Sequence, residues 1–333
     1  MTGYIIRRIG QGILFIILVS IGIFSMIRLT PGDPAQIMAG VQATPEAIER
    51  IREEMGLDKP FWVQYGTWAK RALHGDLGVS AETKTPVSKE LRKRFAATME
   101  LTAVAMLFGT IAGVLAGIIA AVYRNSFFDY ASMFIAVFGL SVPVFWLGLL
   151  LLLIFGLFIP VFPLGGRVPG SMDIVHITGF YAIDTLVQGD FENFMVVIKY
   201  LFLPAITLGT IPAALIARMT RSGMLEVLQA DYIRTARSKG LPERSVIFKH
   251  ALRNALLPIV TVIGLNFAIL LAGAVLTETI FSWPGMARYI VRAVGVRDYP
   301  VIQGGILVIA IMVLIVNTLI DILYCIIDPR IVY

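Results

Sequence analysis

Six stretches of the chain carry no charged residue and are rich in apolar side chains, which is the pattern of membrane-spanning helices. They cover residues 9–27, 101–123, 130–166, 200–217, 254–277 and 299–320. Because about 20 residues of helix cross a bilayer core, the sequence predicts six spanning helices. The third stretch is too long for one crossing, and Pro160, Pro163, Gly165 and Gly166 are expected to end its helix near residue 158. The predicted fold class is an all-α polytopic membrane protein.

The composition agrees with this pattern. Hydrophobic residues make up 57% of the 333 residues and charged residues 15%, and the mean hydropathy is +0.82, well outside the range of soluble globular domains. The first stretch follows Arg7 and Arg8, but it is longer than a typical signal-peptide core and no small-residue cleavage site comes after it. We therefore expect a retained first helix rather than a cleaved signal.

The distribution of basic residues favours an orientation with both chain ends in the cytoplasm. In that orientation the inner segments carry twelve Lys and Arg residues, and the outer loops 160–195 and 282–301 carry four. Residues 30–95 would lie outside with ten more, but loops longer than about 60 residues have little influence on orientation. The predicted domains are the N-terminus and first helix (1–29), an extracytoplasmic helical segment (30–95) and a five-helix core (96–333) with a cytoplasmic loop at 218–255.

The segment 30–95 has the signals of folded helices. Thr44 and Pro45 predict a helix start with Thr44 as N-cap, and Gly56 predicts its end. A second helix is expected after Pro60, and a third from Thr85 and Pro86 towards the second span.

Aromatic residues recur at helical spacing in the second of these helices. Phe61, Tyr65, Trp68 and Ala72 share one face. Such a face suits either the wet edge of a bilayer or packing against neighbouring helices, and the sequence leaves both alternatives open.

Small residues and carboxylates mark the membrane region. Gly109, Gly113 and Gly117 lie four residues apart, so one face of the second span lacks side chains and predicts a packing seam, within the chain or with a partner.

Glu100, Glu278 and Asp321 lie at or near the ends of apolar runs, and Asp321 is the best candidate for a buried polar contact. Since ionisable groups are missing from mid-span, an ion-coupled secondary transporter is the weaker alternative.

The sequence contains none of the motifs that we would expect of an enzyme. Cys325 is the single cysteine, and His74, His176 and His250 are scattered, so no metal set is expected. No GxxxxGK[ST] motif and no nucleophile with its base stand out. We expect that the chain is not an enzyme by itself, that it binds no cofactor of its own, and that it has no nucleic-acid partner.

The loop between the fourth and fifth spans is unusually charged. Residues 225–238 predict a helix with one apolar stripe, and Gly240 is its expected stop, in a left-handed conformation. The stripe consists of Leu225, Leu228, Tyr232 and Ala236, with Arg234, Arg237 and Lys239 beside it. Pro242 and Glu243 predict a second helix start. Val246, Ile247 and Ala251 are expected on the apolar side of that second helix.

This pattern predicts a short helical hairpin on the cytoplasmic face, and reversing the charge of Arg234 or Arg237 is expected to leave its backbone unchanged. A basic amphipathic segment lying on anionic lipid is the alternative interpretation of the same composition.

The residues of this loop carry a family resemblance. "DYIRTARSKG" followed by "HALRNALLP" resembles the cytoplasmic loop of permease subunits in the dipeptide, oligopeptide and nickel branch of bacterial and archaeal ABC importers. The resemblance extends to "GLDKPFWVQYGTW", "GDLG", "LSVPVFWLGLLLL", "ETIFSWPGMARYIVRAVGVRDYP" and "DPRIVY", so only residues 159–195 show no sharp resemblance. The wider importer superfamily has a motif of EAA, three residues, G, nine residues and IxLP, and this chain matches it poorly. When Gly240 is aligned with the G of the motif, Arg234, Thr235 and Ala236 stand at the EAA positions. His250, Ala251, Leu252 and Arg253 stand at the IxLP positions.

The resemblance implies the fold and partners of a type I ABC importer. A second homologous permease would complete the pore, two ATPase domains or subunits would bind ATP and Mg, and an extracytoplasmic solute-binding protein would deliver the solute. The expected location is the cytoplasmic (inner) membrane of a prokaryote. The residues implied in ATPase coupling are Asp231, Tyr232, Arg234, Thr235, Ala236, Arg237, Lys239, Gly240, Leu241, His250 and Arg253.

The expected substrate is a di- or oligopeptide, because the chain offers few histidines or cysteines to hold a bare metal. Nickel complexes or another small solute are the alternatives within the family. The sequence does not identify substrate-binding residues, although a pore that passes what a binding protein selects is expected to be lined by small and weakly polar side chains.

Overall fold

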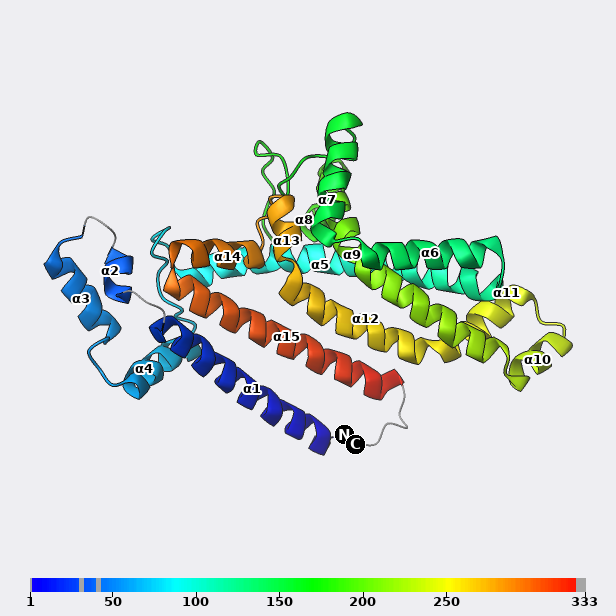
Figure 1. Cartoon of the computed structure of the whole chain (residues 1–333), viewed down its shortest axis with the longest axis horizontal. Coiled ribbons are helices and arrows are strands. Elements are labelled where there is room, and N and C mark those ends of the chain that lie inside the picture. Colours follow the sequence, from blue (N-terminus) through cyan, green and yellow to red (C-terminus); the bar gives the residue numbers. More distant parts are fainter. Residues whose placement is uncertain (1, 30–32, 40–42, 328–333) are drawn as a thin grey trace. The chain divides into compact units, whose positions relative to one another are not determined.

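The computed structural model describes residues 2–29, 33–39 and 43–327, and every regular element in these ranges is a helix (Figure 1). The helices are α1 (Thr2–Leu29), α2 (Pro34–Ala39), α3 (Pro45–Met55), α4 (Phe61–Leu73), α5 (Val87–Val122), α6 (Phe127–Ser141), α7 (Val144–Leu152), η1 (Leu153–Phe158), α8 (Tyr181–Val187), α9 (Phe191–Leu228), α10 (Asp231–Ser238), α11 (Glu243–Ser245), η2 (Val246–Leu252), α12 (Arg253–Gly273), α13 (Val275–Ile280), α14 (Met286–Val296) and α15 (Tyr299–Ile327). The predicted all-α fold class is confirmed. The terminal "DPRIVY" lies outside the described residues.

Five helical segments of the described chain are long and apolar enough to cross a membrane. They are Arg7–Leu29, Val87–Val122, Phe191–Leu228, Glu243–Leu271 and Tyr299–Ile322. A sixth crossing exists if α6 and the helix formed by α7 and η1 are counted together, although the two are bent by 103°. This number agrees with the six predicted spans.

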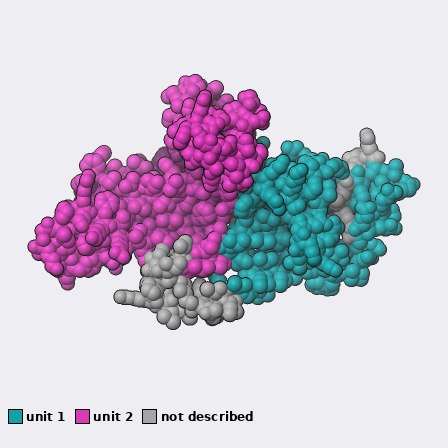
Figure 2. All heavy atoms as spheres, turned by 180° about the vertical axis from the view of Figure 1, so that it is seen from behind, with its two compact units in different colours: residues 1–98, 284–315 teal, residues 99–283, 316–333 magenta. Residues whose placement is uncertain are grey.

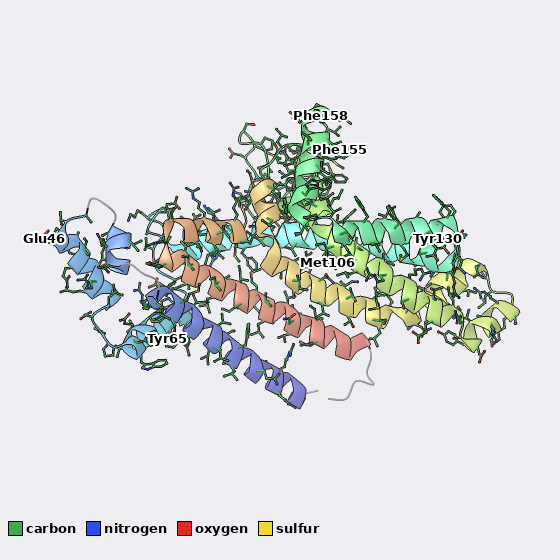
Figure 3. All side chains as sticks on the ribbon, in the orientation of Figure 1. Glu46, Tyr65, Met106, Tyr130, Phe155 and Phe158 are labelled. Atoms are coloured by element: carbon green, nitrogen blue, oxygen red, sulfur yellow. The ribbon has the colours of Figure 1, made fainter. Side chains whose placement is uncertain are left out.

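The third predicted span is not a single helix, because it breaks between α6 and α7. Val142 is extended, with φ −81° and ψ 125°, and Pro143 directly precedes the next helix as its N-cap. A residue before proline avoids the helical region because the proline ring crowds its backbone, which accounts for the break. The predicted end near residue 158 is confirmed, since the helix ends at Phe158 (Figure 3).

The chain divides into two compact units (Figure 2). The first comprises residues 1–98 and 284–315, and the second residues 99–283 and 316–333. The domain boundaries predicted from the sequence refer to the two sides of a membrane, and they stay predictions.

In the first unit the aromatic face of α4 packs against α1. Phe24 of α1 is fully buried, and its ring lies 5.4, 5.5 and 5.7 Å from the rings of Phe61, Tyr65 and Trp68. The hydroxyls of Tyr65 and Ser20 are 2.8 Å apart. Of the two alternatives for this face, packing against a neighbouring helix is therefore the one observed.

The predicted helix signals before α4 are also confirmed. The Thr44 side chain accepts a hydrogen bond from the Ala47 amide, and Pro45 is the first residue of α3. Gly56 ends the helix with φ 60°, in the left-handed region. The local sequence alone determines these helix ends. The start depends on the side chain of Thr44, and the end depends on the ability of Gly56 to adopt a left-handed backbone conformation.

In the second unit the glycine face of α5 lies directly against α9. A Cβ on Gly109 would come within 2.9 Å of the Gly209 carbonyl oxygen, and one on Gly113 within 2.6 Å of the Ala213 carbonyl oxygen. At Gly117 the nearest atom would be the Thr220 Cβ, 2.5 Å away. The two backbones meet at distances that no larger residue allows, so this face is a seam within the chain.

Replacing Gly113 with Ala is expected to destabilise the second unit by about 1–3 kcal/mol, because the added methyl group forces α5 and α9 apart. The Ala213 carbonyl is part of a helix backbone and cannot rotate away. Thermal unfolding of the purified chain in detergent measures the effect. Gly22→Ala in α1 is the matched control, since a Cβ there meets nothing within 4 Å. Equal melting temperatures for the two variants would contradict the seam.

Candidate functional site

The charged loop begins where α9 ends. The prediction of one helix over residues 225–238 is wrong, because α9 stops at Leu228 and α10 starts at Asp231. Between them Ala230 is extended, with φ −69° and ψ 147°. The break redirects the chain into a separate hairpin, formed by α10, α11 and η2. We call it the coupling hairpin (residues 231–252), after the role that the family resemblance implies for it.

The coupling hairpin has a distinct buried side. On the second arm Val246, Ile247 and Ala251 are all buried, as predicted. On the first arm Ile233 and Ala236 are buried, whereas Tyr232 is 46% exposed. The predicted stripe is thus wrong for Tyr232, because the break at residue 230 changes the helical phase of α10 relative to α9. The second arm packs against α9, α10 and α12.

Gly240 forms the turn between the two arms. Its φ is 76°, which confirms the expected left-handed conformation. The Gly240 amide donates to the Arg237 carbonyl at 2.9 Å, and the Leu241 amide donates to the Ala236 carbonyl at 3.4 Å. This is the usual way for a glycine to terminate a helix, and Pro242 then starts the second arm.

An ion pair links the two arms across this turn. Arg237 donates from Nε and Nη2 to the two carboxylate oxygens of Glu243, at 3.2 and 2.6 Å. The hydrogen bonds to Glu243 raise the pKa of Arg237 above its ordinary value, outweighing a smaller opposing effect of burial. Both side chains are about half exposed, so the pair contributes only about 0.2–1 kcal/mol. Arg237 therefore acts inside the hairpin, and the expectation that its charge reversal leaves the local structure unchanged is corrected.

Most of the other residues predicted for coupling are accessible. Asp231 and Arg234 lie 3.5 Å apart at side-chain exposures of 95% and 77%. The remaining exposed members are Tyr232, Thr235, Lys239, Gly240, Leu241 and Arg253. His250 is partly buried and Ala236 is buried. Between residues 231 and 241, every residue except Ile233 and Ala236 is exposed.

Sequence reasoning missed part of this exposed surface. Phe248 is 52% exposed, and Arg244 and Lys249 are exposed beside it. The signal was the triplet Val246, Ile247, Phe248, since three consecutive helical residues cannot all face one side. With Tyr232 and Leu241, Phe248 gives the coupling hairpin three large apolar side chains in contact with solvent.

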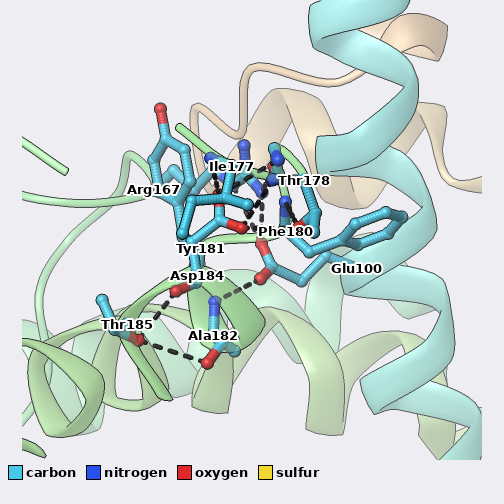
Figure 4. Close-up of polar contacts among 10 residues, drawn as sticks. Glu100, Arg167, Ile177, Thr178, Phe180, Tyr181, Ala182, Asp184 and Thr185 are labelled. Carbon is cyan, nitrogen blue, oxygen red and sulfur yellow. Dashed lines mark hydrogen bonds and ion pairs between the residues drawn. The ribbon is translucent and has the colours of Figure 1, made fainter. Parts of the chain in front are cut away.

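A second cluster, in the stretch without a sequence signal, is centred on Arg167 (Figure 4). Arg167 donates to one carboxylate oxygen of Glu100 at 2.9 and 2.5 Å and to the Gly179 carbonyl at 2.7 Å. Both charged side chains are nearly fully buried, at 7% and 4% exposure. The Ala182 amide donates to the other Glu100 oxygen at 2.7 Å, and the guanidinium lies 3.6 Å from the centre of the Tyr181 ring.

Asp184 also stabilises this loop, through hydrogen bonds to its backbone and to a hydroxyl group. It is fully buried and accepts hydrogen bonds from the Thr178 amide at 2.8 Å, the Thr178 hydroxyl at 2.6 Å and the Gly179 amide at 3.0 Å. Burial raises its pKa, but these hydrogen bonds outweigh burial and hold the pKa below its ordinary value. The stabilisation is present above the unfolded-state pKa of about 3.9 and is lost as pH falls through the lower folded-state pKa. The loop between η1 and α9 is therefore held in one defined conformation by these hydrogen bonds.

Family comparison covers almost the whole chain. Residues 113–333 match the model described as binding-protein-dependent transport system inner membrane component. Residues 1–102 match the model of the N-terminal part of the membrane component of such systems.

Several curated proteins are similar to the chain over its full length. It is 51% identical over 333 residues to the dipeptide transport system permease protein DppB of Alkalihalophilus pseudofirmus, covering 100% of both chains. It is 48% identical over 335 residues to the protein of the same name from Escherichia coli K12, covering 99% of both. It is 39% identical over 333 residues to the glutathione transport system permease protein GsiC of an Escherichia coli O6:H1 strain, covering 100% of both. With both family models matched, the chain belongs to the inner membrane components of binding-protein-dependent transport systems.

Proposed function

We propose that the chain is one half of the translocation pore of an ATP-driven importer for di- or oligopeptides. The observation that carries this proposal is the full-length identity of 48–51% to permeases named for dipeptide transport. The 39% identical relative is named for glutathione, which is itself a tripeptide. Family membership is compatible with nickel complexes or other solutes, but these relatives favour peptides.

The energy for transport would come from separate ATPase subunits that bind ATP and Mg. The sequence has no phosphate-binding GxxxxGK[ST] motif, so nucleotide binding falls to a partner. The coupling hairpin is the element that would enter a cleft of that partner. Its exposed Tyr232, Leu241 and Phe248 supply apolar contact area, and Arg234 and Lys239 supply charge for acidic groups.

A pocket between α9 and α12 is the candidate for part of the solute path. Its volume is about 390 Å³, and its lining combines apolar and polar side chains. The lining residues are Leu215, Arg218, Met219, Ser222, Val262, Leu265 and Asn266. Arg218 is exposed and directly follows the apolar run 200–217, so its guanidinium is placed to meet water or a solute at the inner end of the pocket. A second permease facing this pocket would close the path, and a binding protein would supply the peptide.

Ligands retained by the cognate binding protein test the substrate. We expect mass spectrometry of the freshly purified binding protein to find di- or oligopeptides, and a transporter reconstituted with this chain to import the same peptides. Recovery of a metal chelate or a sugar in place of peptides would sink the substrate proposal while leaving family membership intact.

Cysteine labelling tests the orientation, which places both chain ends in the cytoplasm of a prokaryotic cell. In a Cys325→Ser background, Glu53→Cys should react with a membrane-impermeant maleimide in intact cells. Glu243→Cys should react only after the membrane is opened. Because Glu243 pairs with Arg237, Ser238→Cys on the exposed side of α10 serves as a second inner position. The reverse pattern of labelling would overturn the orientation.

Charge reversals at Arg234 and Arg237 should have separable effects. Arg234→Glu should reduce ATPase recovery by removing an exposed charge from the contact, with the hairpin intact. Arg237→Glu should also reduce ATPase recovery, because it places a second carboxylate next to that of Glu243 across the turn. The double variant Arg237→Glu, Glu243→Arg restores the ion pair with opposite polarity. Recovery of ATPase copurification in this variant, and not in Arg237→Glu, is the expected result. Equal defects in the single and double variants would show that Arg237 contacts the partner directly.

A further inference from the structure

The first unit contains a polar pocket of about 250 Å³ that no part of the transport proposal uses. It lies where the end of α1, the middle of α4 and the start of α15 meet. Its lining includes Arg28, Gln64, Thr67, Trp68, Arg71 and Gln303. The pocket therefore joins side chains that are far apart in the sequence, from three helices of one compact unit.

Gln303 is the first indication that this pocket binds a ligand. The residue is only 5% exposed, and its side-chain Nε2 has no hydrogen-bond partner among the described residues. Native structures rarely leave a buried amide donor unpaired, because its desolvation is then uncompensated. An acceptor oxygen in the pocket would resolve this cost.

Arg28 is the second indication, and it is independent of the first. Its Nε donates to the Gln64 side-chain oxygen at 3.3 Å, and its guanidinium lies 3.9 Å from the centre of the Phe24 ring. In the described part of the chain, no carboxylate forms an ion pair with it. Arg71, which lines the same pocket, differs because it is paired with Asp76 at 2.8 Å. Arg28 is thus a half-buried cation that lacks an anion.

The position of the pocket indicates the source of that anion. Arg28 lies in the last turn of one candidate span, and Gln303 lies in the second turn of another. Both are at the level where a membrane-spanning helix leaves the hydrocarbon, which is where phospholipid phosphates lie. On the two helices that supply Arg28 and Gln64, Leu18 and Leu29 of α1 and Trp62 of α4 are 60%, 82% and 66% exposed, as expected of surface that meets acyl chains and the interface.

The acidic residues of the pocket do not oppose an anionic group. Asp76 is already bound by Arg71 and accepts from the Gly78 amide at 2.9 Å. Glu54 is exposed and would remain hydrated, or would meet the amine of a zwitterionic headgroup.

We infer that this pocket binds the headgroup of a phospholipid, with its phosphate diester held by the Arg28 guanidinium and the Gln303 amide. Arginine suits phosphate because its planar fork donates two parallel hydrogen bonds to the oxygens. The lipid tails extend over the exposed apolar surface of α1. This site is separate from the coupling hairpin and does not depend on the identity of the solute.

Native mass spectrometry of the full-length chain in detergent, with palmitoyl-oleoyl phosphatidylethanolamine added, tests the inference. The lipid should bind about tenfold more tightly than diacylglycerol with the same chains, since the latter lacks the phosphate. Soluble glycerophosphoethanolamine and inorganic phosphate distinguish a headgroup site from a free-anion site. If either displaces the lipid at equal concentration, a free anion is the ligand and the lipid assignment is wrong.

Variants locate the site. Arg28→Gln and Gln303→Leu should each weaken lipid binding about tenfold, and Arg28→Lys should retain more of it than Arg28→Gln. Arg50→Gln is the control, because it removes a charge from an exposed position of α3 outside the pocket. Melting temperatures measured alongside identify any variant that fails to fold. Unchanged lipid binding in both Arg28→Gln and Gln303→Leu, with the protein folded, would overturn the inference.

Discussion

Arg167→Met is expected to lower the free energy of unfolding by about 3–5 kcal/mol, because it leaves the buried carboxylate of Glu100 without its cation. The two side chains are 7% and 4% exposed, so water cannot replace the lost partner. The Gly179 carbonyl loses its donor as well, and the Tyr181 ring loses the guanidinium beside it. Thermal unfolding of the purified chain measures the loss. Limited proteolysis should show the first cuts in the loop between η1 and α9.

Two further variants separate loss of the pair from loss of packing. Adding Glu100→Gln to Arg167→Met should restore much of the stability, because a neutral amide can stay buried and still accept from the Ala182 amide. Arg292→Met breaks a pair with Glu82 whose side chains are 70% and 30% exposed, and it should cost less than about 1 kcal/mol. A loss for Arg167→Met no larger than that for Arg292→Met would show that the buried pair does not hold the loop.

Local signals predicted the parts of the fold that depend on one or a few neighbouring residues. Thr44 begins a helix, Gly56 and Gly240 each end one, and the structure shows all three in these predicted roles. The break at Pro143 was missed although proline is a strong signal. It lies within an unbroken apolar run, where no charged residue marks an end, and only the end of the helix near residue 158 was assigned, to Pro160 and the residues after it.

The polar cluster could not be derived from sequence because its partners are distant. Glu100 and Arg167 are 67 residues apart, and only the packing of the second unit brings them together. A weak signal existed, since Arg167 is the single Lys or Arg between Arg124 and Lys199. An isolated charge beside apolar runs needs a partner, but the sequence does not say which. The same limit applies to Arg237, whose pairing with Glu243 depends on the angle of the Gly240 turn.

The largest functional effect is expected from Gly240→Val. The backbone at this turn has φ 76°, and a residue with a branched Cβ strongly disfavours that conformation, at a cost of about 1–2 kcal/mol or more. A Cβ at this position would meet nothing within 4 Å, so the cost arises from the backbone and not from a clash. The arms of the coupling hairpin would then separate or change their angle, while the membrane-spanning helices remain unaffected.

The proposed coupling role predicts that Gly240→Val loses most transport and most stimulation of ATP hydrolysis by the loaded binding protein, with insertion into the membrane unchanged. Gly240→Asn should retain more of both, because asparagine tolerates the left-handed region. Gly66→Val in α4 is the matched control, since it also adds a side chain into open space but lies within a helix. A hairpin that only lies on anionic lipid predicts a different result, in which Gly240→Val weakens membrane-surface contact and ATPase recovery stays normal. Wild-type transport by Gly240→Val with a full ATPase complement would therefore remove the coupling role from residues 231–253.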